Sequence, residues 1–124
     1  MKRYMLLIAS LALSGTAYAY DKDGIFSAWG SGSCGQLIKE LKLGQVAETV
    51  NEMYVQGFVA GINATIPGKA DFFAGTDSAS RFRFVVKYCE ENPLSSITGA
   101  LDEMVKKITG EDMQNLAPKP AGFK

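Results

Sequence analysis

Apolar residues recur every three or four positions in four segments of the chain, and this spacing predicts four helices. The first predicted helix begins at Cys34, with Ser33 as its N-cap, and Gly44 stops it. The last runs from Leu94 to Thr109 and carries a narrow apolar stripe opposite a charged face. Since no segment favours a strand over a helix, we expect an all-α domain of four helices.

The second predicted helix extends from Gln45 to about Ile66 and is apolar on two sides, which is typical of a buried helix. Gly57 and Gly61 lie inside it, and each costs about 1 kcal/mol relative to alanine in a helix interior. We therefore expect another helix to pack closely against these two glycines. The alternative is a break in the helix near Gly57.

The third predicted helix runs from Ala79 to about Glu91, with Asp77 or Ser78 as its cap. Apolar and charged residues alternate over positions 81–84, which leaves a strand as an alternative. A helix is favoured because positions 82–89 keep the 3.6-residue period and Asn92-Pro93 ends it.

Two adjacent aromatic residues, Phe72 and Phe73, lie in the loop that precedes this helix. Adjacent aromatics on a loop can anchor a binding partner. The alternative is that one of them fills the core. We keep both residues as candidate binding residues.

Residues 1–19 have the features of a secretory signal peptide. Lys2 and Arg3 precede an apolar run, and Ala17-Tyr18-Ala19 supplies the small-x-small cleavage pattern. The run is about half the ~20 residues that a membrane span needs, so cleavage is favoured over a permanent anchor. We expect a periplasmic protein that has no membrane span after cleavage.

The rest of the chain divides into three parts. Residues 20–33 are rich in Gly, Ser and Asp and predict an irregular arm, which contains Trp29. Residues 34–110 contain the predicted helical domain, and residues 111–124 predict a flexible tail. The organisation is therefore a leader, an arm, one domain and a tail.

Cys34 and Cys89 are the two cysteines of the chain, and an oxidising compartment favours a disulfide between them. A bridge between residues this far apart would stabilise the fold by roughly 4 kcal/mol through the entropy of the unfolded chain. The rival interpretation is a reactive thiol or a metal ligand. Two cysteines without any histidine are a poor metal site, so we expect no bound metal.

Composition excludes several functional classes. The chain has 13 basic and 13 acidic residues, and removal of Lys2 and Arg3 with the leader gives a net charge of −2. Nucleic-acid binding needs a basic surplus, so we expect no nucleic-acid partner. The absence of histidine removes the usual general base, and acidic pairs such as Glu48 and Glu52 are typical of solvated helix faces. We therefore expect no catalytic residue, no cofactor and no enzymatic activity.

The order of several residues resembles a known family. Trp29 shortly precedes Cys34, an apolar helix follows that cysteine, and Cys89-Glu90-Glu91-Asn92-Pro93 leads into the last helix. This arrangement resembles the HdeA family of periplasmic acid-stress proteins. The resemblance implies a small four-helix fold with a disulfide between Cys34 and Cys89, and it implies no catalytic residue.

A second resemblance concerns residues 54–61, with the sequence YVQGFVAG, and residues 85–88, VVKY, ahead of Asn92-Pro93. Both segments resemble related periplasmic immunity proteins that neutralise type VI secretion effectors. The two resemblances imply two roles, and in both the protein acts by contact with other periplasmic proteins. A homodimer is one form that such contact takes.

As an acid-stress chaperone, the mature protein would pass from a net charge of −2 towards +11 as its carboxylates protonate. Self-repulsion would then favour exposure of apolar surface, with Trp29, Phe72 and Phe73 as candidate contact residues. As an immunity protein, it would hold a preformed surface against one toxin near neutral pH.

Overall fold

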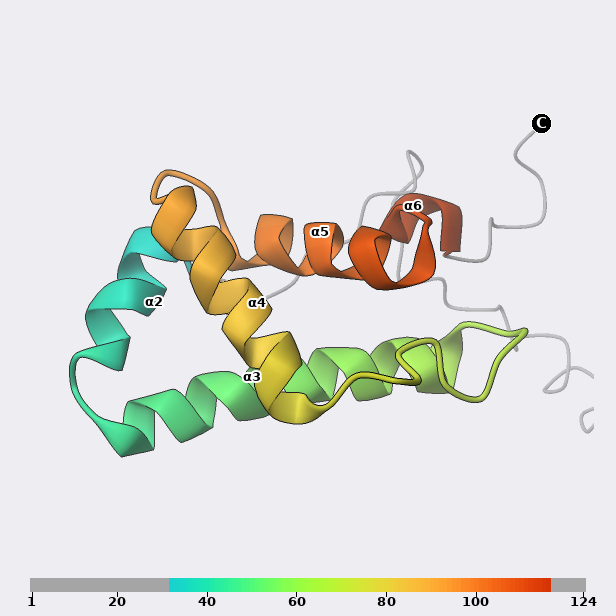
Figure 1. Cartoon of the computed structure of the whole chain (residues 1–124), viewed down its shortest axis with the longest axis horizontal. Coiled ribbons are helices and arrows are strands. Elements are labelled where there is room, and N and C mark those ends of the chain that lie inside the picture. The colour runs from blue at the N-terminus through green and yellow to red at the C-terminus, as the bar shows by residue number, and fades with distance from the viewer. Residues whose placement is uncertain (1–31, 117–124) are drawn as a thin grey trace, which may run out of the picture. The chain divides into compact units, whose positions relative to one another are not determined.

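The computed structural model describes residues 32–116, which form five helices. They are α2 (Cys34–Leu41), α3 (Gln45–Thr65), α4 (Ser78–Glu91), α5 (Ile97–Thr109) and the short α6 (Met113–Leu116) (Figure 1). Between residues 32 and 116 the chain forms no strand, so the all-α prediction is confirmed there. The predicted signal peptide and Trp29 lie outside the described residues, as does the predicted arm except for Gly32 and Ser33.

Local capping interactions set where the helices begin and end. Ser33 caps α2 by accepting a hydrogen bond from the Gln36 backbone N–H at 3.1 Å, as predicted. Ser96 caps α5 in the same way, so α5 begins after it and not at Leu94 as we expected. Leu94 is instead fully exposed between α4 and α5. Gly110 ends α5 with φ of 81°, a left-handed conformation that glycine adopts without strain.

The central helix α3 continues through Gly57 without a break, but it is packed on one side alone. Val55, Val59 and Ile62 are buried, whereas Val46 and Val50 are exposed. The prediction that this helix is buried all round is therefore wrong. The physical reason is that α2 and α4 are the described helices that pack against α3, and they cover one face.

The core lies between α4, α5 and the inner faces of α2 and α3. Every buried side chain in the described part of the chain is apolar. The largest fully buried side chains are Phe73, Leu37, Leu101, Met104, Val55, Val85 and Val105. Because no charged side chain is buried there, protonation of surface carboxylates does not directly change the stability of the core.

The disulfide predicted from the sequence joins Cys34 at the start of α2 to Cys89 near the end of α4, with their Cα atoms 4.7 Å apart. Next to Cys34 in the chain, Ser33 pairs with Ser96 in an isolated antiparallel β-bridge. In this bridge the Cys34 backbone N–H donates to the Ser95 carbonyl at 2.9 Å. The beginning of α2, the end of α4 and the beginning of α5 are therefore held together at one point.

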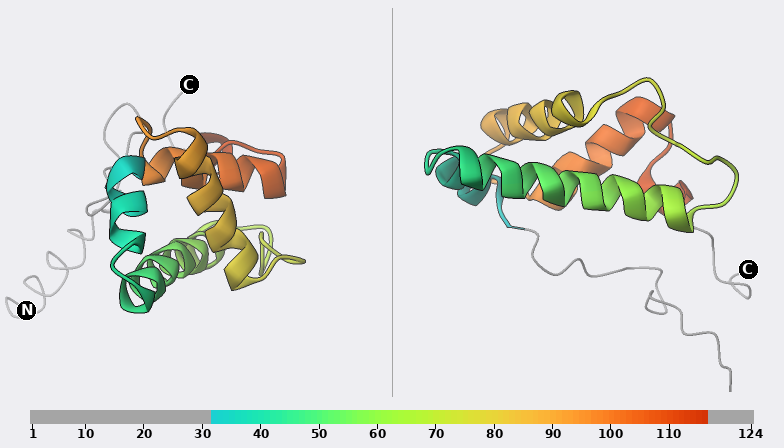
Figure 2. Two further views of the ribbon diagram at one scale, coloured as in Figure 1. Left: turned by 60° about the vertical axis from the view of Figure 1, so that its left-hand side comes forward. Right: turned by 90° about the horizontal axis from the view of Figure 1, so that it is seen from below.

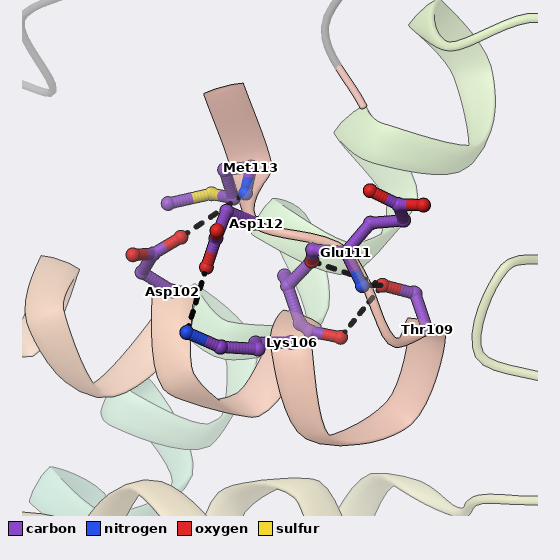
Figure 3. A network of polar contacts seen from close by, with 7 residues as sticks. Asp102, Lys106, Thr109, Glu111, Asp112 and Met113 are labelled. Carbon is purple, nitrogen blue, oxygen red and sulfur yellow. Dashed lines mark hydrogen bonds and ion pairs between the residues drawn. The ribbon is translucent and has the colours of Figure 1, made fainter. Parts of the chain in front are cut away.

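The start of the predicted tail contains the short helix α6 (Figure 3). The Met113 backbone N–H donates to an Asp102 carboxylate oxygen at 3.1 Å. Lys106 forms an ion pair with Asp112 at 3.1 Å, and this hydrogen bond raises the pKa of the Lys106 ammonium. Two contacts from α5 thus hold the start of α6. The apolar spacing of the sequence does not predict them.

Candidate protein-contact surface

The outward face of α3 carries a continuous line of apolar and small residues. We call it the α3 stripe, and its residues follow one another at spacings of four, three, four, three and four: Val46, Val50, Met53, Gly57, Ala60 and Ala64. All six are exposed, with Val46 at 80%, Val50 at 60% and Met53 at 67%. Viewed from the α3 side, this helix lies in front of the other described helices (Figure 2, right). The sequence identified this face correctly but placed it inside the core.

The two glycines of α3 have no neighbour within residues 32–116. A Cβ atom built at Gly57 or Gly61 would meet no atom within 4 Å. The helix contact that we expected at these glycines is therefore not made between the described helices. The reason is again that α2 and α4 pack on the opposite side of α3.

The charged residues of α3 lie away from the stripe. Glu48 and Glu52 are the two charged residues of this helix, and the Ser78 hydroxyl of α4 donates a hydrogen bond to the Glu52 carboxylate. At 100° per residue, both carboxylates fall on the side of α3 that turns towards α4. The stripe is consequently an uncharged apolar surface in contact with water.

A polar network holds the beginning of α4 against α3. The Arg81 guanidinium donates to the Gln56 side-chain oxygen at 2.8 Å. It also donates to the backbone and hydroxyl oxygens of Thr76, both at 2.9 Å. Because Arg81 makes three hydrogen bonds to two other segments, this network fixes the orientation of α3 and therefore of its outward stripe.

The aromatic pair in the loop divides between core and surface. Phe73 is completely buried, which fits the alternative that it fills the core. Phe72 is half-buried against the core. Asn63 of α3 positions the loop, because its side-chain oxygen accepts from the Phe72 backbone N–H at 2.9 Å and its amide donates to Asp71 at 2.9 Å. Neither the apolar period nor a local motif predicts this role of Asn63, because it depends on contacts between α3 and a later loop.

A groove of about 770 Å³ lies along α4 and is closed on one side by Leu41 of α2 and Glu48 of α3. Its lining combines phenylalanine and valine side chains with charged side chains of both signs. The residues that α4 supplies are Ser80, Phe82, Arg83, Phe84, Val86, Lys87, Glu90 and Glu91. Protein–protein contacts usually combine apolar and polar side chains in this way.

Asp77, the N-cap of α4, has a perturbed carboxyl group. Its carboxylate accepts a hydrogen bond of 2.7 Å from the Ser80 backbone N–H, and the Asp77 backbone N–H donates to the Ser80 hydroxyl oxygen at 3.2 Å. The hydrogen bond from the Ser80 backbone N–H is the main cause that lowers the pKa of the Asp77 carboxyl below its usual range, and the Ser80 side chain lowers it further. Asp77 is an exposed residue that caps α4.

Within the region from residue 32 to residue 116, no three His, Cys, Asp or Glu residues group closely enough to hold a metal ion. None of the helices in that region combines the length and apolar character that crossing a membrane requires. The candidate site is therefore a surface, formed by the α3 stripe and the groove along α4. No protein-family model, curated protein or solved structure matches the chain in sequence or fold.

Proposed function

We propose that the protein is a non-enzymatic, protein-binding protein of the periplasm, of the HdeA-like type, which acts as an acid-stress chaperone or protein-binding factor. The observation that carries this proposal is the uncharged α3 stripe, whose three largest side chains are each at least 60% exposed. Contiguous apolar surface on a small domain is typical of protein contact sites.

The composition of the core supports activity in acid. No charged side chain is buried among residues 32–116, and the core is apolar and closed by the Cys34–Cys89 bridge. Protonation of surface carboxylates therefore adds net positive charge without leaving a buried charge unpaired. The ion pairs of the described surface, Lys87–Glu91 and Lys106–Asp112, are exposed and contribute little to folding. The stripe would stay available to unfolded clients at low pH.

The test is an aggregation assay at pH 3 with an acid-labile globular enzyme as the client. The wild-type chain is expected to suppress light scattering, and Val50→Lys in the stripe is expected to abolish most of that suppression. A lysine is used because it stays charged at pH 3. Leu94→Lys is the control, since Leu94 is also apolar and is even more exposed than Val50 but lies outside the stripe. Equal suppression by Val50→Lys and Leu94→Lys would contradict the role of the stripe.

An immunity protein that neutralises a type VI secretion effector is the alternative, and the groove along α4 favours it. Its charged rim offers specific pairing to one partner, which an uncharged stripe does not. In this case Arg83→Glu, at the groove, would remove a stoichiometric partner that co-purifies at pH 7, while Val50→Lys would leave it bound. For an immunity protein we expect binding to the partner to be strongest near neutral pH, whereas a chaperone is expected to bind its clients at low pH.

A further inference from the structure

The connection between α2 and α3 exposes apolar side chains at the turn. Leu43 is 79% exposed, and Val46, three residues later, is 80% exposed. Between them Gly44 has φ of 105°, a conformation that favours glycine, and a Cβ atom built on it would meet no atom within 4 Å. We call residues 39–46 the α2–α3 corner. It lies at the end of α3 that is opposite to the loop leading to α4, and it projects from the described helices (Figure 1).

Basic side chains accompany these two apolar residues. Lys42 directly precedes Leu43, and Lys39 lies in the last turn of α2. Both lysines are exposed, and within residues 32–116 neither of them forms an ion pair. Their charges are therefore open to a partner.

The acids nearest to the corner are directed elsewhere. The Glu40 carboxylate accepts a hydrogen bond from the Gln36 amide at 2.9 Å and one from the Asn51 amide at 3.4 Å, which tie it to α2 and α3. Glu48 lines the groove along α4. At 100° per residue, Glu48 lies about 160° around α3 from Val46. The exposed charge beside Leu43 is consequently positive.

Aliphatic side chains with lysines beside them suit the surface of an anionic bilayer. Aliphatic groups enter the boundary between headgroups and acyl chains, while the lysine ammonium groups stay at the level of the lipid phosphates. Each lysine close to an anionic surface strengthens binding about fivefold. A projecting turn also fits a flat, deformable surface without the need for a matching pocket.

We propose that the α2–α3 corner binds the surface of an anionic phospholipid bilayer, with Leu43 and Val46 among the headgroups and Lys39 and Lys42 at the phosphates. The complementarity between the two lysines and anionic headgroups selects this partner. The inference goes beyond the proposed function, because it concerns where the protein is held and not which protein it contacts. Val46 also begins the α3 stripe, so a bound molecule would present the rest of that stripe beside the membrane.

The size of the corner sets the expected affinity. A single myristoyl chain gives marginal membrane binding, with an association constant of about 10⁴ M⁻¹. Leu43 and Val46 together carry about half as many apolar carbons as that chain. The contact is therefore reversible, and its measurement needs roughly 1 mM lipid or more.

The first experiment is co-sedimentation of the full chain, expressed with its own leader, with vesicles at pH 7. Vesicles of phosphatidylglycerol and phosphatidylcholine in equal amounts are compared with vesicles of phosphatidylcholine alone. The wild type is expected to bind the anionic vesicles about fivefold or more tightly. Most of this binding should be lost when the salt concentration rises from about 0.05 M to about 0.5 M. Equal binding to both kinds of vesicle would overturn the proposal.

Two pairs of variants locate the contact. Leu43→Asp is expected to weaken binding to the anionic vesicles about tenfold or more. Leu94→Asp places the same charge at an exposed apolar position outside the corner and is expected to change binding less than about twofold. Lys42→Glu is expected to weaken binding about tenfold, and Lys107→Glu, at an exposed lysine of α5, is its control. Equal losses within each pair would show that binding follows net charge, and the corner would have no special role.

The second experiment shows which part of the protein reaches the lipid. Leu43→Cys and Leu94→Cys chains are labelled with an environment-sensitive fluorophore. Cys34 and Cys89 do not compete for the label, because they are bonded to each other and fully buried. With anionic vesicles, emission from position 43 should shift to shorter wavelength and be quenched by nitroxide-labelled lipid, whereas emission from position 94 should not. Equal quenching at both positions would overturn the orientation.

A protein is the other partner that an apolar corner could have. In that case the wild type would bind neither kind of vesicle, and Leu43→Asp would lose client suppression in the aggregation assay at pH 3. This pair of results would overturn the membrane contact and extend the α3 stripe to Leu43. Because the aggregation assay contains no lipid, a failure of vesicle binding leaves the proposed function standing.

Discussion

At the scale of single residues, the Asp77 carboxylate connects pH to helix stability. It caps α4 through the Ser80 backbone N–H, and this hydrogen bond holds its pKa below the ordinary 3.8. A carboxyl whose pKa is lower in the folded state stabilises the fold at pH values above the unfolded pKa. That contribution is lost as the pH falls from about 3.8 through the folded pKa.

Asp77→Asn tests this dependence because asparagine keeps a capping oxygen but carries no charge. We expect the variant to melt at a lower temperature than the wild type at pH 7. The difference should be smaller at about pH 2 than at pH 7, because Asp77 loses its charge as the pH falls through its lowered pKa. Melting curves at a series of pH values measure it. Glu90→Gln, which removes an exposed carboxylate near the other end of α4, controls for the loss of one charge. A difference in melting temperature that is the same at both pH values would contradict the capping argument.

At the scale of elements, α3 has two faces with opposite environments. Val55 is 1% exposed on the core face, whereas Val50 is 60% exposed on the stripe. Val55→Ala is expected to lower the free energy of unfolding by about 2 kcal/mol, from lost burial and the remaining cavity. Val50→Ala is expected to change it by less than about 0.5 kcal/mol. Urea unfolding of both variants and the wild type at one low protein concentration measures both changes. Equal losses would mean that the stripe is covered in the monomer.

The helices themselves could be predicted from sequence because their signals are local. The period of apolar residues, the caps Ser33 and Asp77 and the stop at Gly110 act within a few residues of each helix end. The prediction placed the first turn of the last helix at Leu94, whereas α5 begins after the cap Ser96. The apolar period alone does not separate Leu94, which precedes the cap, from Ile97, which follows it. The short α6 escaped prediction because its support, Asp102 and Lys106, comes from another helix.

The surface could be predicted only in part. Periodicity shows which residues share a face of α3, but whether another helix covers that face depends on how the helices pack in space. For the same reason, the sequence alone does not show which of Phe72 and Phe73 is buried. The packing of the helices buries Phe73 completely and leaves Phe72 half-buried. The groove along α4 combines residues from three helices and has no signature in any one of them.

At the scale of the whole molecule, the Cys34–Cys89 bridge closes a loop that contains most of α2, all of α3 and most of α4. Replacing both cysteines with alanine is expected to lower the free energy of unfolding by roughly 4 kcal/mol, mainly because the unfolded chain becomes freer. Urea unfolding of the double variant measures this loss. Urea unfolding of the wild type in the presence of a reductant measures the same loss of free energy without any substitution. A loss below about 1 kcal/mol would show that the apolar core alone sustains the fold.

The bridge also determines what happens when the backbone is cut. The loop between α3 and α4, at residues 66–77, lies inside the ring that the two sulfurs close, and much of it is exposed. A protease that hydrolyses one peptide bond there separates no fragment, because both pieces remain attached through sulfur. A single cut in this loop therefore leaves the two halves of the chain covalently joined for as long as the disulfide stays oxidised.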